Sequence, residues 1–574
     1  MKRLMLGNEA IARGAYEAGV RVVSSYPGTP STEITEYISK YDEIYSEWAP
    51  NEKVAAEVAA GAAIAGARAM SAMKHVGMNV AADPMFTMSY IGVNAGLVLC
   101  VADDMGMHSS QNEQDSRNYA KASKLPMLEP ADSAECKNYV KLAYDLSERY
   151  DTPVLIRLST RVSHSQSIVE ECPRVDNGVK DYQKDIMKNV MMPAMARAKH
   201  IVVEKRMQDM AEYAETMDIN HIEWGDKKIG IISAGIAYEY AKEAMPQASF
   251  LKLGMLYPMP KKMIRDFAVQ CDQVYVVEEL DPFIEEYCKT IGIEVKGKEL
   301  FTLLGEYTPE MIRAGILGQP LQVAEKEAIP NRPPVMCPGC PHRGVFYVLN
   351  KMKTTVSGDI GCYTLGAMAP LAAIDVCICM GASISGMHGM QKARGKEFAH
   401  NAVAIIGDST FTHSGITGLI DIVYNKGNST VVILDNDITG MTGHQQNPAT
   451  GYTLKGEPTV RVDFELLAKS IGVNSIRVVD PFDIVQVETV LKEEMAKDEP
   501  SVVIARRPCA LLKQVSYGAP CSIDQDKCTG CKMCMKIGCP AITFENKKAK
   551  IDSSQCIGCS LCTNICKFGA ITKG

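Results

Sequence analysis

The cysteines at the C-terminal end of the chain repeat one spacing twice. The chain has 574 residues and 20 cysteines, and nine of these lie from Cys521 onward. Eight of the nine form two runs with Cys-x2-Cys-x2-Cys spacing and a fourth cysteine shortly after: Cys528, Cys531, Cys534 and Cys539, then Cys556, Cys559, Cys562 and Cys566. Cysteines spaced this closely, in a large chain without a signal-peptide pattern, serve as metal ligands rather than disulfide partners. The segment therefore predicts a small domain folded around two four-cysteine metal centres.

This duplication resembles the pattern of bacterial two-cluster ferredoxins, in which each fourth cysteine crosses to the other cluster. The resemblance implies two [4Fe–4S] clusters. One would be held by Cys528, Cys531, Cys534 and Cys566, the other by Cys539, Cys556, Cys559 and Cys562. Zinc is the poorer alternative, because two four-cysteine sets with this duplicated spacing are unusual for it. One extra residue before Cys539, and Lys567 where proline is common, depart from the pattern and bear on cluster potential.

Residues 402–443 also constrain the fold that the chain can adopt. Two short β-branched apolar runs flank a helix-length amphipathic segment, which predicts two parallel strands joined by a crossover helix. Ligands of open α/β sheets bind at the carboxyl ends of the strands, so Asp408 and Asn436 are expected side by side. Their side-chain oxygens, with the backbone carbonyl of Ile438, form a hard oxygen set suited to Mg²⁺ that carries a diphosphate.

Gly407-Asp408-Ser409 followed by Asp435-Asn436 resembles the Gly-Asp-Gly…Asn-Asn signature of thiamine diphosphate enzymes. The next residues, Met441-Thr442-Gly443-His444-Gln445, are similar to the version in 2-oxoacid:ferredoxin oxidoreductases. The resemblance implies a magnesium ion bound by Asp408, Asn436 and the Ile438 carbonyl. It also implies cofactor binding by the same residues together with Ser409, Thr442 and Gly443. Ser409 replaces the family's more common glycine, a small-for-small change.

Residues 51–69 are rich in alanine and glycine, which predicts a helix packed closely against another helix or a cofactor. A carboxylate at Glu57 in such surroundings needs a partner. The Glu-x3-Gly-Ala spacing resembles the family, in which a glutamate shares a proton with the aminopyrimidine of thiamine, an interaction that burial strengthens. Glu57 is therefore the expected catalytic base, whereas Glu52 is expected to be a solvated residue of the first turn.

An earlier segment also resembles this superfamily. Tyr26-Pro27-Gly28-Thr29-Pro30-Ser31-Thr32 follows a predicted strand and is similar to the family's Tyr-Pro-Ile-Thr-Pro-Ser, whose first threonine faces the substrate. The resemblance gives Thr29 that role. Without it, the segment is a turn whose Ser31 caps the next helix.

The segment Cys337-Pro338-Gly339-Cys340 resembles the Cys-Pro-x-Cys turn that ferredoxin-linked oxoacid enzymes use for the cluster nearest thiamine. Cys362 and Cys509 stand at positions similar to this cluster's other two ligands. Four thiolates would complete a third [4Fe–4S] site. Two alternatives stay open, namely zinc at the same cysteines and a branch of the family that lost this cluster.

The patterns predict an α/β protein, and the resemblance implies transketolase-like thiamine diphosphate-binding domains and a C-terminal two-cluster bacterial ferredoxin-like α+β domain. Its five parts are a pyrimidine-binding domain (1–170), a helical connecting segment (171–225), a transketolase C-terminal-like domain (226–325), a diphosphate-binding domain (326–517) and a ferredoxin domain (518–574). A Pro-rich linker at 330–334 leads into the diphosphate-binding domain. A chain of this length has room for about three to five domains.

Charge and composition exclude some functions. A formal net charge of −7 argues against a nucleic-acid partner. No apolar run reaches the roughly 18 residues of a membrane span, so no membrane partner is expected. The many thiols and 32 methionines fit a reducing, oxygen-poor setting, and the protein is expected to be cytoplasmic.

The resemblance covers nearly the whole chain and is closest to the large (alpha) subunits of indolepyruvate ferredoxin oxidoreductases. It implies oxidative decarboxylation of an arylpyruvate, with coenzyme A as second substrate and electrons passed through the clusters to ferredoxin. It also implies a separate small (beta) subunit and a two-fold hetero-oligomer. The alternatives are an oxidoreductase for another 2-oxoacid, a non-redox thiamine decarboxylase or carboligase that keeps clusters for structure, and an electron-transfer subunit without chemistry.

Overall fold

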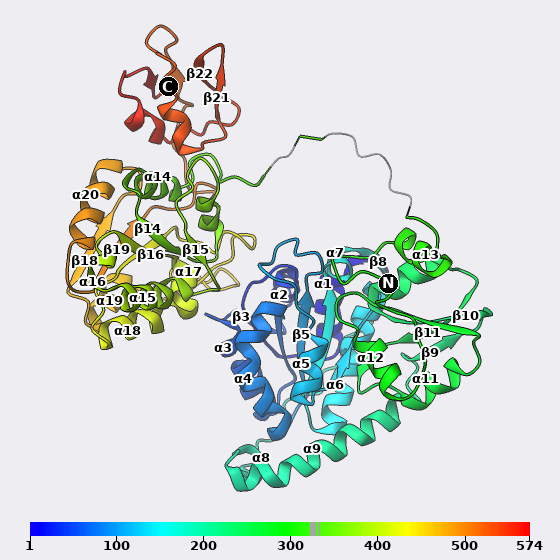
Figure 1. Ribbon diagram of the computed structural model, residues 1–574. Coiled ribbons are helices and arrows are strands. Elements are labelled where there is room, and N and C mark those ends of the chain that lie inside the picture. Colours follow the sequence, from blue (N-terminus) through cyan, green and yellow to red (C-terminus); the bar gives the residue numbers. More distant parts are fainter. Residues whose placement is uncertain (322–328, 331–332) are drawn as a thin grey trace. The chain divides into compact units, whose positions relative to one another are not determined.

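The computed structural model describes residues 1–321, 329–330 and 333–574 and divides into two compact units, Met1–Lys326 and Glu327–Gly574 (Figure 1). The predicted border at 325/326 and part of the 330–334 linker lie outside the described residues. The other predicted borders stay predictions. Among the helices that the structure describes, none has the length and apolar character needed to cross a membrane.

The first unit is built on a seven-stranded sheet with the order β12-β6-β7-β5-β4-β2-β3. The strands are β2 (Val22–Ser25), β3 (Tyr45–Trp48), β4 (Ala69–Lys74), β5 (Leu97–Asp103), β6 (Met127–Leu128), β7 (Val154–Ser159) and β12 (Met255–Tyr257). All pairs are parallel except β12 with β6. Every residue of β4, β5 and β7 is buried, as expected for parallel strands covered on both faces.

Helices pack on both faces of this sheet and form two hydrophobic cores. The helices up to residue 164 are α1 (Gly7–Glu17), α2 (Thr32–Ile38), α3 (Glu52–Ile64), α4 (His75–Ile91), α5 (Arg117–Ser123), α6 (Ser133–Tyr150) and α7 (Thr160–His164). Strand β1 (Lys2–Leu6) pairs with β8 (Gln166–Glu170) beside them. Asn51 caps α3 by accepting the N–H of Val54 at 2.9 Å, and the alanines of α3 pack against α4 and the sheet.

A second, four-stranded sheet completes the first unit, with the order β13-β10-β11-β9. Its strands are β9 (His221–Glu223), β10 (Asp226–Ala234), β11 (Ala248–Leu253) and β13 (Gln273–Val277). The helices of this part are α8 (Ile186–Asn189), α9 (Pro193–Ala214), α10 (Gly235–Ala244), α11 (Lys261–Ala268), α12 (Phe283–Thr290) and α13 (Pro309–Leu317). Strand β12 leaves this part of the chain and adds an antiparallel edge to the seven-stranded sheet.

A buried ion cluster links the two sheets of the first unit. Arg117 forms ion pairs with Asp115 and Glu278, both at 2.5 Å, and also donates to the carbonyls of Glu279 and Asp281. The side chains of Arg117, Asp115 and Glu278 are at most 3% exposed. Burial works against the charge on Arg117, but the two carboxylates hold its pKa above the usual value.

Replacing Arg117 with Met is expected to destabilise the first unit by about 3–5 kcal/mol, because it leaves two buried carboxylates without their cation. Both tryptophans of the chain, Trp48 and Trp224, lie in this unit, so fluorescence during urea unfolding reports it selectively. The control is R161M, since the Arg161 side chain is 56% exposed and such a pair contributes about 0–1 kcal/mol. Equal unfolding midpoints for R117M and R161M would contradict the prediction.

The second unit contains a parallel six-stranded sheet with the order β15-β14-β16-β17-β19-β18. The strands are β14 (Thr355–Gly358), β15 (Val376–Cys377), β16 (Ala402–Gly407), β17 (Thr430–Asp435), β18 (Ser475–Val479) and β19 (Ser501–Arg506). Its helices are α14 (His342–Met352), α15 (Ala382–Arg394), α16 (Lys396–Ala399), α17 (Asp408–Thr410), α18 (Ile416–Tyr424), α19 (Phe464–Ile471) and α20 (Ile484–Met495). A π-helical turn, Phe411–Gly415, joins α17 to α18 and completes the predicted crossover between β16 and β17.

The C-terminal module, residues 518–574, is small and rich in loops (Figure 1). It has two antiparallel strand pairs, β20 (Ser522–Ile523) with β23 (Ile571–Thr572) and β21 (Ile542–Glu545) with β22 (Lys548–Ile551), and two 3₁₀ turns, Met533–Ile537 and Leu561–Ile565. Its apolar residues do not form a separate core. They belong to one hydrophobic cluster with residues of α14, α20 and the six-stranded sheet.

Candidate functional site

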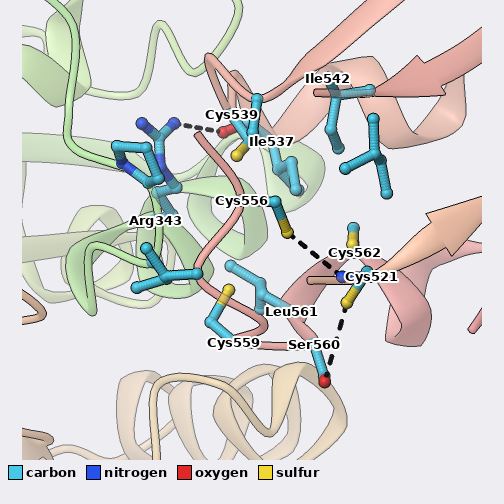
Figure 2. Close-up of a pocket in the computed structure, with 15 residues that line it drawn as sticks. Arg343, Cys521, Ile537, Cys539, Ile542, Cys556, Cys559, Ser560, Leu561 and Cys562 are labelled. Atoms are coloured by element: carbon cyan, nitrogen blue, oxygen red, sulfur yellow. Dashed lines mark hydrogen bonds between the residues drawn. The ribbon is translucent and has the colours of Figure 1, made fainter. Parts of the chain in front are cut away.

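The structure brings together both predicted cysteine sets of the C-terminal module. One cavity is lined by Cys528, Cys531, Cys534 and Cys566, together with apolar residues such as Ile523 and Phe568. A second cavity is lined by Cys539, Cys556, Cys559 and Cys562 (Figure 2). In both cavities one cysteine comes from the other repeat, which is the crossed arrangement that the resemblance to two-cluster ferredoxins implies. Four thiols around an apolar cavity fit a [4Fe–4S] cluster.

Cys521 also lines the second cavity, although the cysteine pattern did not include it (Figure 2). It is 4% exposed, and its backbone N–H donates to the sulfur of Cys556 at 3.3 Å. Hydrogen bonds to ligating sulfurs tune the potential of iron–sulfur clusters. Its position just before the first repeat was the only sequence signal, and spacing alone does not separate such a residue from a ligand.

The third predicted set, Cys337, Cys340, Cys362 and Cys509, also converges. The Cys340 N–H donates to the Cys337 carbonyl at 3.1 Å in a tight turn. Burial, with the charge of neighbouring thiolates added, raises the pKa of Cys340 to about 12 and that of Cys362 to about 11. The Cys337 thiolate acts in the same direction on Cys509. A bound metal centre would offset the repulsion between the neighbouring thiolates. The cysteines present therefore fit the predicted inner cluster.

Asp408 and Asn436 follow neighbouring strands, as predicted, and meet the carbonyl of Ile438. Turned one way, the Asn436 amide nitrogen donates to Asp408 Oδ1 at 3.1 Å and to the Ile438 carbonyl at 3.0 Å. Turned the other way, the Asn436 amide oxygen faces the other two oxygens at these distances. Neighbouring ligands of an octahedral Mg²⁺ are about 3.0 Å apart when the bonds are about 2.1 Å long. The three groups therefore fit a magnesium ion.

The electrostatics of this oxygen set also favour a cation. Asp408 is 2% exposed, and burial, together with the charges of Asp435 and Asp437, raises its pKa to about 8. Ser409 donates its backbone N–H to Asp408 Oδ1 at 2.8 Å and so fixes the carboxylate. Among the other predicted cofactor residues, Thr442 bonds to the Gln445 side chain at 2.5 Å, and Gly443 has a φ of +122°.

In the first unit, the carboxyl ends of β2, β4 and β5 place a second polar group together. The carbonyl of Thr29, four residues after β2, accepts a 3.4 Å hydrogen bond from the Ser109 hydroxyl. Lys74, the last residue of β4, is 9% exposed and donates to the Ser109 carbonyl at 3.1 Å. Burial lowers the pKa of Lys74, whereas the charges of Asp104 and Glu52 raise it. Sequence reasoning did not single out Lys74.

The structure contradicts the predicted environments of the two glutamates of α3. Glu57 is not buried: its side chain is 46% exposed and pairs with Lys53 at 2.7 Å. Glu52 is not solvated: it is 4% exposed and lies against Gly77, where a Cβ would come within 2.5 Å of Glu52 Oε1. Helical geometry explains the reversal, since Glu52 continues the buried stripe of Ala55, Ala56, Ala59 and Ala63, and position 57 falls outside it.

Three protein-family models match this chain. The model "Pyruvate flavodoxin/ferredoxin oxidoreductase, thiamine diP-bdg" matches residues 13–228. "Thiamine pyrophosphate enzyme, C-terminal TPP binding domain" matches residues 359–505, and "4Fe-4S dicluster domain" matches residues 521–567. The matched segments contain the polar group of the first unit, the oxygen set and the two tail cavities, respectively.

Curated relatives align over nearly the full chain. The indolepyruvate oxidoreductase subunit IorA of Archaeoglobus fulgidus is 42% identical over 99% of this chain and 97% of its own length. The subunits of the same name from Pyrococcus horikoshii and Methanothermobacter thermautotrophicus are 40% and 38% identical, with 100% and 99% of this chain covered and 97% of each relative. The chain belongs to the indolepyruvate oxidoreductase IorA family. The predicted superfamily and fold class are thereby confirmed.

Membership of the IorA family makes this chain an enzyme of the 2-oxoacid:ferredoxin oxidoreductase type. Thiamine diphosphate and iron–sulfur clusters are its cofactors, which confirms the coarser part of the predicted chemistry.

Proposed function

We propose that this chain catalyses the oxidative decarboxylation of an arylpyruvate such as indolepyruvate, with coenzyme A as acyl acceptor and ferredoxin as electron acceptor. The observation that carries the proposal is the contact between the oxygen set and the inner cysteines. The Cys509 N–H donates to the Asn436 carbonyl at 2.9 Å, and a Cβ on Gly440 would lie 3.4 Å from the Cys362 sulfur. An electron acceptor would therefore lie directly beside the diphosphate end of the cofactor.

Thiamine diphosphate supplies the carbon nucleophile for attack on a 2-oxoacid and, after CO₂ is lost, an electron pair for an acceptor. Asp408, Asn436 and the Ile438 carbonyl would hold the magnesium ion. The inner cysteines would hold the first one-electron acceptor. Thr29 remains the candidate that faces the substrate, because it lies at the ligand-binding edge of the seven-stranded sheet.

Burial favours Glu52 over Glu57 as the proton-sharing base. A carboxylate in a low-dielectric site forms a stronger hydrogen bond to the aminopyrimidine than one in water does. Glu52 starts α3, is buried and lies near Lys74, whereas Glu57 is exposed and paired with Lys53. We therefore assign the base to Glu52. Glu57 is the competing assignment, and the E52Q and E57Q variants distinguish the two.

The proposal includes a partner subunit. The relatives are named as subunits of an oxidoreductase, which supports a small (beta) subunit beside this chain. The polar group around Thr29 and the oxygen set around Asp408 belong to different compact units. The proposal also includes a two-fold hetero-oligomer.

The test is an anaerobic assay of the reconstituted complex with indolepyruvate, coenzyme A and a viologen dye. The proposal expects dye reduction that depends on coenzyme A, with arylacetyl-coenzyme A as product. Release of an aldehyde without dye reduction would instead identify a non-redox decarboxylase. If other 2-oxoacids supported dye reduction and indolepyruvate did not, the substrate would belong to a different class of 2-oxoacid.

Iron content provides a separate prediction. The protein prepared without air is expected to contain about twelve irons per chain, four for each of three clusters. Replacing Cys362 with Ser should reduce this to about eight, because the inner set loses a ligand and the tail sets keep theirs. The control is C377S, since Cys377 is exposed and lies outside all three sets. About eight irons in the unchanged protein would show that the inner set binds no cluster.

A further inference from the structure

Arg343 is a buried arginine between two cysteine sites. It is 2% exposed and follows the Cys337–Cys340 turn by three residues, in the first turn of α14. Its side chain also lines the cavity of Cys539 and Cys559 (Figure 2). One side chain therefore borders both the proposed inner cluster and the second cluster of the tail module.

The guanidinium group of Arg343 bonds only to backbone carbonyls. Nη1 donates to the carbonyls of Ile537 at 2.8 Å and Gly538 at 2.6 Å, immediately before Cys539. Nε and Nη2 donate to the Cys337 carbonyl, each at 3.2 Å, and Nη2 also donates to that of Met336. Within the described part of the chain, no carboxylate forms an ion pair with Arg343. These bonds fasten the loop before Cys337 to the loop before Cys539.

The two cysteine loops also touch directly. Gly339, inside the Cys337–Cys340 turn, lies against the second repeat of the tail: a Cβ there would overlap the Ile557 side chain and lie 3.4 Å from the Cys559 Cβ. Gly339 has a φ of +69°, so both its backbone and its contact require glycine. The inner site and the tail cavity that contains Cys559 are therefore immediate neighbours.

Among the residues that the structure describes, no carboxylate compensates the charge of Arg343. Burial lowers its pKa, and the groups that oppose this shift are the thiolates of both sites: Cys539, Cys340, Cys337 and Cys559. A buried cation without an anion is costly. A [4Fe–4S] centre with four thiolates carries net negative charge that increases on reduction, and net charge helps set its potential. A cation beside it therefore stabilises the reduced form.

We infer that Arg343 joins the inner site to the second tail cluster and raises the reduction potential of that cluster through its positive charge. The inference rests on the proposed function. Electrons would then pass from the inner site to the cluster that Cys539, Cys556, Cys559 and Cys562 would hold, and from there to the cluster that Cys528, Cys531, Cys534 and Cys566 would hold. Each step would move one electron from a reduced to an oxidised centre, with no bond or proton transferred, and Arg343 would keep its charge.

The test compares R343Q and R343K with the unchanged chain, all as full-length protein reconstituted without air. Lys keeps the charge but cannot make the forked hydrogen bonds, whereas Gln removes the charge. The readouts are iron content and the reduction potentials of the tail clusters, followed by electron paramagnetic resonance. We expect R343Q to shift one cluster's equilibrium at least tenfold toward the oxidised form, about 59 mV for one electron. R343K and K536Q, which removes an exposed cation of the same module, should stay close to the unchanged potential.

The outcomes are distinct. Fully loaded R343Q with unchanged potentials would overturn the inference. If R343Q loses iron, the R343K variant distinguishes the two explanations. Full iron loading of R343K with an unchanged potential supports a requirement for the positive charge. Loss of iron from both variants shows that Arg343 has a purely structural role and overturns the inference. Failure of the proposed function has another signature, because the unchanged chain would then lack indolepyruvate-dependent dye reduction while its cluster potentials remained measurable.

Discussion

Replacing Glu52 with Gln is expected to lower kcat by about 10²–10⁴-fold, the range for loss of a positioned acid–base group. The amide has the size of the carboxylate but cannot hold a proton for the aminopyrimidine. Glu52 is buried at the start of α3, so no water molecule from bulk solvent can readily replace it. The measurement is anaerobic dye reduction with indolepyruvate and coenzyme A, with iron content and thiamine diphosphate binding checked to be unchanged.

The matched control is E57Q on the same helix. Glu57 forms an exposed pair with Lys53 four residues earlier, and such pairs contribute about 0.3–0.5 kcal/mol, so activity should stay close to that of the unchanged enzyme. The reverse result, an inactive E57Q with an active E52Q, would restore Glu57 as the base. It would also indicate that a partner subunit buries this face of α3.

Replacing Asp408 with Asn is expected to weaken thiamine diphosphate binding in the presence of Mg²⁺ by at least about 100-fold. Asp408 is the ionisable member of the oxygen set, and loss of groups that merely support a metal ligand already costs about 10–100-fold in affinity. Calorimetric titration with thiamine diphosphate and Mg²⁺ measures the effect. The iron content should not change, because the tail cavities do not use this residue.

D437N is the control for this second variant. Asp437 directly precedes Ile438, pairs with Arg461 at 2.5 Å and has a φ of +60°, which asparagine tolerates well. The Asp437 side chain is 24% exposed. The change removes one negative charge and leaves the three members of the oxygen set unchanged. Equal weakening by D408N and D437N would show that general negative charge, and not metal ligation by Asp408, determines the affinity.

Local spacing was enough to predict the tail module and the βαβ unit. Ligand cysteines such as Cys528 and Cys531 are three residues apart, and their geometry depends little on the rest of the chain. In the same way, Asp408 and Asn436 come together because parallel neighbouring strands end at one edge of a sheet. Both predictions use rules that act within a single supersecondary unit.

The features that were missed depend on contacts between distant segments. Glu52 is buried because Gly77 of the next helix leaves room for its side chain. Arg343 bonds to Ile537, 194 residues further along the chain, and no local sequence pattern around position 343 indicates this partner. Strand β12, which sequence reasoning did not identify, pairs with β6 of the first sheet. None of these contacts leaves a periodic signal in the sequence.

The C-terminal module shares one hydrophobic cluster with α14, so packing holds it against the rest of the second unit. A carrier on a flexible tether would have to travel between donor and acceptor during each turnover, and viscous solvent would slow it. With the proposed clusters bound, packed side chains would instead set the spacing of the redox centres. Only the proposed external acceptor would then have to diffuse, so its arrival should make electron delivery sensitive to viscosity and salt.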